Sequence, residues 1–91
     1  MKLFLVHTGF YDNNISNGFY EMHTNYFIVA ENEKSAKKRV STLSEYKEKK
    51  MHIDGLLEIS NVGHYNIRLE MINKHSLKSN NQFSYSDVKK I

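Results

Sequence analysis

The chain has 91 residues, which is enough for one domain with one modest core and too few for a second. It contains no cysteine, and this excludes disulfides, thiolate metal sites and cysteine nucleophiles. The apolar run at residues 3–6 is shorter than the roughly 7–15 residues of a signal peptide, and no segment approaches the ~20 apolar residues of a membrane span. We therefore expect a soluble, cytoplasmic protein.

The net charge of +3 comes entirely from the C-terminal segment. Residues 1–73 contain nine Lys and Arg against nine Asp and Glu, whereas residues 74–91 contain four Lys against one Asp. The high isoelectric point is thus a property of this segment and not of a basic face on the folded body. Charge by itself is therefore weak support for nucleic-acid binding.

The first two predicted elements are strands. Residues 2–8 are apolar on both faces, and a turn-rich, Asn-rich loop follows over residues 9–18. Alternation over residues 19–30 predicts a second strand with two distinct faces. One face carries Glu21, His23, Phe27 and Val29. The other face carries Tyr20, Met22, Tyr26 and Ile28.

A helix is predicted next. Asn32 is a good N-cap, and Glu33 follows in the first turn, where the helix dipole favours an anion. Apolar residues then recur at three- and four-residue steps from Ala36 to Tyr46, which indicates one narrow apolar stripe. The lysines at positions 47, 49 and 50 suit a C-terminus, so the helix is expected to end there.

Two further strands complete the prediction, at residues 56–62 and 65–72, joined as a hairpin. The result is an α+β fold: a small ββαββ domain over residues 1–73, with an antiparallel four-stranded sheet in spatial order 2-1-3-4 and one helix on one face. Residues 74–91 are polar and aperiodic, and we predict a mobile C-terminal tail.

One helix can cover only one face of a sheet, yet the first two strands are apolar on both faces. A second apolar face left in water would be an unusually large exposed patch. A second copy, a partner protein or the tail must then cover it. Twofold self-association is the commonest solution, so we expect a homodimer.

Several short motifs resemble the DUF1543 family, a group of small, mostly bacterial proteins without an established function. They are residues 1–6, Glu21-Met22-His23 leading into residues 27–30, His52-Ile53-Asp54, and Tyr65-Asn66-Ile67. The similarity covers roughly residues 1–70. The chain departs from the family pattern in its longer Asn-rich loop and in Gly63-His64-Tyr65, where relatives tend to show Asp-Gly-Tyr. The resemblance implies a fold class and a bacterial origin, and no chemistry.

The polar residues Glu21, His23, His52 and Asp54 could meet if the segment before the third strand folds back toward the start of the second strand. Two His and two carboxylates are suitable ligands for Zn²⁺, Mn²⁺ or Fe²⁺. They could equally be a His general base oriented by an Asp. In the structural alternative, residues 52–55 form a turn, and Glu21 and His23 are a local ion pair.

A basic helix face is the second candidate site. Lys37, Lys38 and Arg39, with Tyr46 nearby, could contact phosphates. Glutamates on the same segment interrupt this positive field, and a charged helix face is usually only solvated. The histidines at positions 7, 64 and 75 are expected to face solvent.

The favoured interpretation is a small non-enzymatic protein-interaction domain, adaptor or regulator, that acts as a homodimer with no cofactor and no metal. Its interaction surface is predicted at Phe19, Tyr20, His23 and Tyr26. The first alternative is a metal-assisted or His/Asp-assisted hydrolase that uses Glu21, His23, His52 and Asp54. The second is a nucleic-acid-binding regulator that uses Lys37, Lys38 and Arg39.

Overall fold

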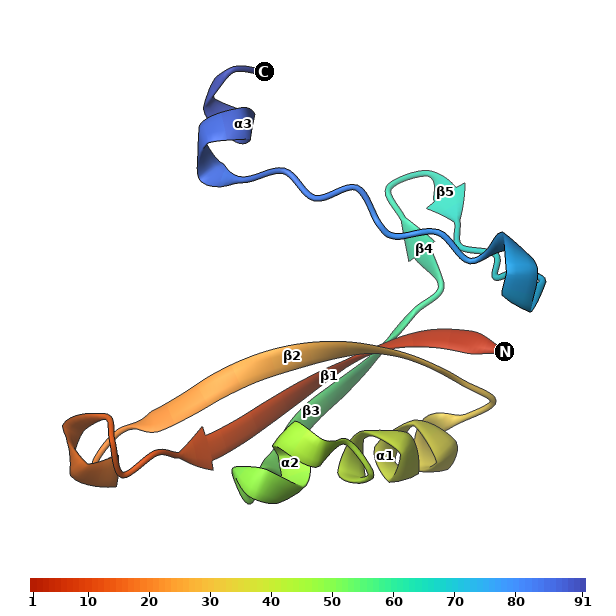
Figure 1. Ribbon diagram of the computed structural model, residues 1–91. Helices are drawn as coiled ribbons and strands as arrows, with labels where there is room; N and C mark the ends of the chain where they lie inside the picture. The colour runs from red at the N-terminus through yellow and green to blue at the C-terminus, as the bar shows by residue number, and fades with distance from the viewer.

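The computed structural model covers residues 1–91 and is built on a three-stranded antiparallel sheet (Figure 1). Its strands are β1 (Lys2–Tyr11), β2 (Glu21–Ala30) and β3 (His52–Ile59), in spatial order β2-β1-β3. The central strand β1 pairs antiparallel with both neighbours. The predicted α+β class and the antiparallel pairing of the first three strands are confirmed.

The helical segment is two helices, where the sequence predicts one. Helix α1 (Glu33–Ser41) begins after Asn32, whose side chain accepts a hydrogen bond of 2.9 Å from the backbone N–H of Ser35. Helix α2 (Ser44–Glu48) begins after Leu43, whose backbone is extended at φ −66° and ψ 137°. Together the two helices span the predicted helix, but the chain breaks between them near Leu43.

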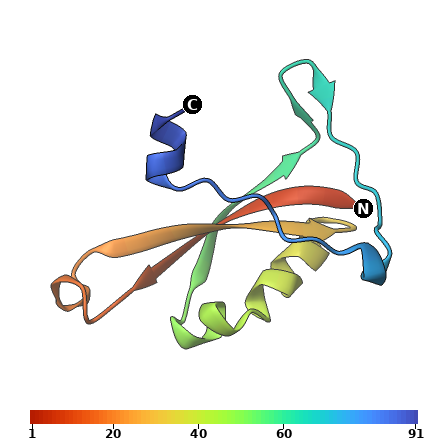
Figure 2. The ribbon, with the colours of Figure 1, turned by 45° about the horizontal axis from the view of Figure 1, so that its top comes forward.

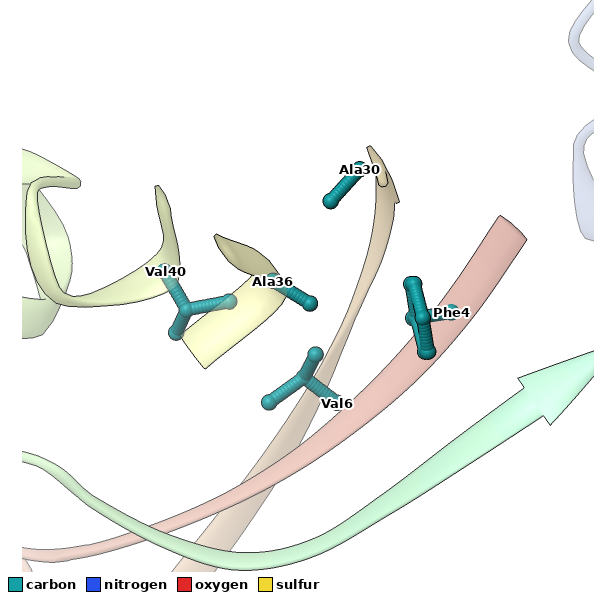
Figure 3. Packing of buried hydrophobic residues seen from close by; sticks show 5 residues of the cluster. All are labelled: Phe4, Val6, Ala30, Ala36 and Val40. Carbon is teal, nitrogen blue, oxygen red and sulfur yellow. The ribbon is translucent and has the colours of Figure 1, made fainter. Parts of the chain in front are cut away.

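The core lies between α1 and one face of the sheet. Five residues form its fully buried cluster (Figure 3): Phe4, Val6, Ala30, Ala36 and Val40. Tyr26, Ile28, Tyr46, Ile53 and Leu56 pack against this cluster and are partly buried. The small side chains Ala30 and Ala36 let α1 approach the sheet closely. Only nine of the 91 residues are buried, so each core side chain carries a large share of the apolar burial that stabilises the fold.

The prediction of a fourth strand in this sheet is wrong. The chain leaves the sheet after β3 and forms a separate two-stranded sheet from β4 (Asn61–Val62) and β5 (Tyr65–Asn66). Gly63, at φ 58°, makes the turn between them. Among the strands, helix α1 packs chiefly on β2 and β1 and also contacts β3. The four-stranded ββαββ arrangement is therefore replaced by a three-stranded sheet and a detached short hairpin.

The remaining elements are short. They are the 3₁₀ helices η1 (Ser16–Gly18) and η2 (Lys74–Ser76) and the helix α3 (Tyr85–Lys89). Ser84 and Asp87 form a capping box at the start of α3, and the hydrogen bonds from Ser84 lower the pKa of Asp87. Every residue from 71 to 91 is exposed. None of the helices is long and apolar enough to cross a membrane.

The face of the sheet opposite α1, here called the open face, has no helix packed on it (Figure 2). Its apolar side chains include Phe27, which is 71% exposed, Leu57 at 59% and Val29 at 39%. The C-terminal segment runs on this side of the molecule (Figure 1), but it leaves these side chains in contact with solvent. The open face therefore has an apolar part that the single chain does not cover.

Candidate functional site

The polar cluster, defined as Glu21, His23, His52 and Asp54, assembles on the open face. Strand pairing brings its members together, because Gly9 of the central strand lies opposite His23 on β2 and opposite His52 on β3. Glu21 stands two residues before His23 in β2 and so lies on the same face. The convergence that the sequence allows is thus present in the structure.

His52 and Asp54 lie inside β3, where the sequence predicts a segment before the third strand or a turn. The strand begins at His52 because Ile53 pairs with Thr8 and packs on the core. Between Ile53–Thr8 and Gly55–His7 the register shifts by one residue, and Asp54 is the extra residue of this β-bulge. The bulge leaves Asp54 next to His52 on the open face.

Short polar distances join the four side chains. His52 Nε2 lies 2.9 Å from Oε1 of Glu21 and 3.0 Å from Oδ1 of Asp54. His23 Nδ1 lies 3.3 Å from Oδ2 of Asp54, and His23 Nε2 lies 3.9 Å from Glu21 Oε1. Both carboxylates therefore approach both imidazoles, and Asp54 uses a different oxygen for each.

The two carboxylates have no Lys or Arg partner within 4.0 Å, and their only ion-pair neighbours are the two histidines. The side chains are partly exposed, from 30% for Asp54 to 47% for His52. One ring nitrogen of His52 faces two carboxylate oxygens but can carry only one proton. A cation between the ligand atoms would neutralise both carboxylates and bind that nitrogen through its lone pair.

Gly9 forms the floor of the polar cluster. A β-carbon at this position would lie 2.5 Å from Oδ2 of Asp54 and 2.6 Å from Nε2 of His52, and it would also collide with the Glu21 carboxylate. These distances are well below van der Waals contact. Glycine is therefore the residue that lets the carboxylates and the imidazole meet over the central strand.

His7, which the sequence predicts as solvent-facing, belongs to the same site. Its ring stacks on that of His23, with centroids 4.8 Å apart and an interplanar angle of 10°. Its Nδ1 lies 2.8 Å from Oδ1 of Asn25. The roles of His7, Gly9 and Asn25 depend on strand register, and the period-two alternation of β1 and β2 is the only sequence signal that could have placed them on this face.

The predicted interaction residues do not form one surface. Phe19 and Tyr20 are exposed in the loop before β2, with their rings edge to face and centroids 4.8 Å apart. Tyr26 lies on the opposite side of the sheet from His23, where its hydroxyl donates a hydrogen bond to Glu45. Burial and this hydrogen bond raise the pKa of Tyr26 to about 12, so it belongs with the helix-covered face.

The predicted basic residues Lys37, Lys38 and Arg39 are exposed on α1. Helix α1 covers the face of the sheet opposite the open face (Figure 2). These basic residues therefore lie on the opposite side of the sheet from the polar cluster. The basic helix face and the polar cluster are therefore two separate candidate sites.

Comparison with known proteins identifies the family of the chain. No match was found among curated proteins or among solved structures. The model of the family described as Domain of Unknown Function (DUF1543) matches residues 18–69. This range includes β2, both helices of the core layer and β3, and with them all four residues of the polar cluster. The chain belongs to the DUF1543 family.

Proposed function

We propose that this domain binds a divalent transition-metal ion on the open face of its sheet. The observation that supports the proposal most strongly is the convergence of Glu21, His52 and Asp54, whose ligand atoms all lie within 4.8 Å of one another. Nitrogen and carboxylate oxygen are the donors that Zn²⁺, Mn²⁺ and Fe²⁺ accept in proteins.

The spacing of the ligand atoms fits this proposal. Bonds of about 2.0–2.1 Å at a tetrahedral metal separate two ligand atoms by roughly 3.3 Å. His52 Nε2 lies 2.9 Å from Glu21 Oε1 and 3.0 Å from Asp54 Oδ1. An opening by a few tenths of an ångström, roughly the difference between these distances and the ideal one, would admit the ion. Side-chain rotation is sufficient for such an opening, because all three residues are partly exposed.

Three protein ligands leave at least one coordination position for water, which is the arrangement of reactive zinc sites and not of closed structural ones. The exposure of the ligands supports an ion that stays in contact with solvent. None of the surface cavities is lined by the polar cluster, so no substrate pocket is formed beside it by one chain. Metal binding is therefore the proposal, and hydrolysis of a substrate stays an alternative that needs a separate activity assay.

Thermal unfolding with and without metal tests the proposal. Chelator-treated protein is melted with Zn²⁺ or Mn²⁺ at about 100 times the dissociation constant, where binding adds about 2.7 kcal/mol to the free energy of unfolding. For a domain of this size the expected rise in Tm is on the order of 10 °C. His52→Ala should reduce the rise, because it removes a ligand of the set formed by Glu21, His52 and Asp54. His75→Ala, which changes an exposed histidine of the C-terminal segment, should leave it intact.

The proposal fails if no divalent ion raises the Tm and calorimetric titration gives no binding heat. It also fails if His52→Ala and His75→Ala respond to metal equally, because the binding would then not involve the polar cluster.

Self-association or binding of another protein through the open face is the second candidate function, as the sequence predicts. The exposure of Phe27 and Leu57 on adjacent parts of this face favours it, since contiguous apolar patches of this kind mark interaction surfaces. A homodimer formed this way would cover the apolar part of the face and bring two polar clusters near the interface.

Analytical ultracentrifugation at tens of micromolar, a range typical for weak dimers, tests the second candidate. Phe27→Glu should convert a dimer to a monomer, whereas Tyr65→Ser, at an exposed aromatic on β5 outside the open face, should not. A wild-type chain that is monomeric under these conditions removes the homodimer from consideration.

A further inference from the structure

We infer that the polar cluster holds two metal ions, with Asp54 as the carboxylate that bridges them. This inference rests on the proposed metal-binding function and specifies it further. Two ligand sets on the open face share one residue: Glu21, His52 and Asp54 form the first set, and His7, His23 and Asp54 form the second set. Within each set all ligand atoms lie within 4.8 Å of one another.

The two oxygens of Asp54 have different nearest imidazoles. Oδ1 lies 3.0 Å from His52 Nε2 in the first set, and Oδ2 lies 3.3 Å from His23 Nδ1 in the second. A carboxylate that binds a single ion through one oxygen has no need of a second imidazole at its other oxygen. A carboxylate with one imidazole at each oxygen can bridge two ions, and metal pairs in proteins lie about 3.5–4 Å apart.

The second set is oriented by its surroundings. His7 Nδ1 donates to Oδ1 of Asn25 at 2.8 Å, which leaves the lone pair of the neutral imidazole on Nε2. A histidine ligand in a protein almost always donates its other ring N–H to such an acceptor, and this contact fixes the ring for metal binding. Asn25 pairs directly with His7 across β1 and β2, so the contact is built into the strand register.

The neighbouring backbone leaves room for both sets. Gly9 lies beneath the first set and has no β-carbon to block the meeting of Glu21, His52 and Asp54. The bulge in β3 adds Asp54 between the strand positions of His52 and Gly55, which puts a carboxylate between the two imidazole groups. Without that bulge the strand would supply one acidic position fewer at this point on the open face.

The number of ions per chain tests the inference. Native mass spectrometry of chelator-treated protein titrated with Zn²⁺ should show two ions in the wild type. His7→Ala should reduce the count to one, and the control His75→Ala should leave it at two. Asn25→Leu keeps all ligands and removes only the acceptor for His7, so the affinity for the second ion should fall about 10–100-fold while the first ion is unaffected.

A second readout addresses the bridge itself. Electron paramagnetic resonance of the protein loaded with Mn²⁺ should show an exchange-coupled pair in the wild type and an isolated ion in His7→Ala. Circular dichroism of each variant establishes that it is folded before its ions are counted.

The outcomes separate the two proposals. One ion per wild-type chain, lost in His52→Ala, leaves the proposed metal-binding function standing and overturns the ion pair. No ion overturns both. Two ions that persist in folded His7→Ala, or two Mn²⁺ ions without exchange coupling, overturn the assignment of Asp54 as a bridge between these sets.

Discussion

A β-carbon added to Gly9 would lie 2.6 Å from Nε2 of His52, although the two residues are distant in the sequence. Gly9→Ala should therefore push apart the ligand atoms of Glu21, His52 and Asp54 and reduce the rise in Tm with Zn²⁺. Gly55→Ala is the matched control, because its β-carbon would meet only His7 Cβ, at 3.9 Å. Melting curves of both variants with and without metal measure the difference. An unchanged metal response in folded Gly9→Ala would contradict the assigned site.

Acidification should weaken metal binding. Protons compete with the ion for the imidazole nitrogens of His23 and His52, and metal ligands must be deprotonated. The Tm difference between metal-loaded and metal-free protein should therefore shrink as the pH falls. Differential scanning calorimetry at several pH values measures it. A difference that is constant with pH would argue against histidine ligands.

The phenylalanines Phe4 and Phe27 lie on opposite faces of the sheet and allow a matched comparison. Phe4 is fully buried, so Phe4→Ala should cost about 3–5 kcal/mol of unfolding free energy. Phe27 is 71% exposed, so Phe27→Ala should change stability by no more than about 0.5 kcal/mol. It should instead weaken self-association. Urea denaturation and sedimentation of the two variants check both expectations, and equal losses of stability would contradict the description of the open face.

Tyr26 should ionise later than the other tyrosines. Burial, followed by its hydrogen bond to Glu45, raises its pKa to about 12, whereas an unfolded tyrosine ionises near pH 10. Between these values the unfolded state loses its proton first, so the stability contributed by Tyr26 is present below about pH 10 and declines as the pH rises toward about 12. The urea midpoint should thus fall more steeply over this range in the wild type than in Tyr26→Phe.

Glu45→Gln is the companion variant. The hydrogen bond from Tyr26 is also the main cause that lowers the pKa of Glu45. Removing the carboxylate should bring the ionisation of Tyr26 closer to that of ordinary tyrosines, with burial keeping it raised. Alkaline absorbance titration of the phenolate measures this change. Identical titrations of wild type and Glu45→Gln would show that the contact does not form in solution.

The sequence predicted the elements that depend on local patterns. The alternation of β2 and the N-cap at Asn32 correspond to observed features, and the family motifs between residues 21 and 67 lie within the matched range. The prediction of a fourth strand failed because the alternation over residues 65–72 carries no information on what would cover such a strand. The break near Leu43 was missed because the apolar stripe from Ala36 to Tyr46 spans both helices without interruption.

The sequence predicted only part of the site, because local patterns do not reveal which strands pair. Alternation placed Glu21 and His23 on one face, but their meeting with His52 and Asp54 depends on the pairing of β2 and β3 with β1. His7 was set aside because nothing in its neighbourhood along the chain identifies its partners. Long-range register, and not residue type, determines which histidines are neighbours.

The β-bulge at Asp54 also affects how such a site can be gained or lost in evolution. Because Asp54 is an extra residue in the pairing of β3 with β1, removing one residue at this point would restore a regular ladder while the rest of the strand kept its partners. A single codon deletion could therefore remove the Asp54 carboxylate from the polar cluster without disturbing the core. Members of the family that differ in length by one residue here are expected to differ in chemistry more than in shape.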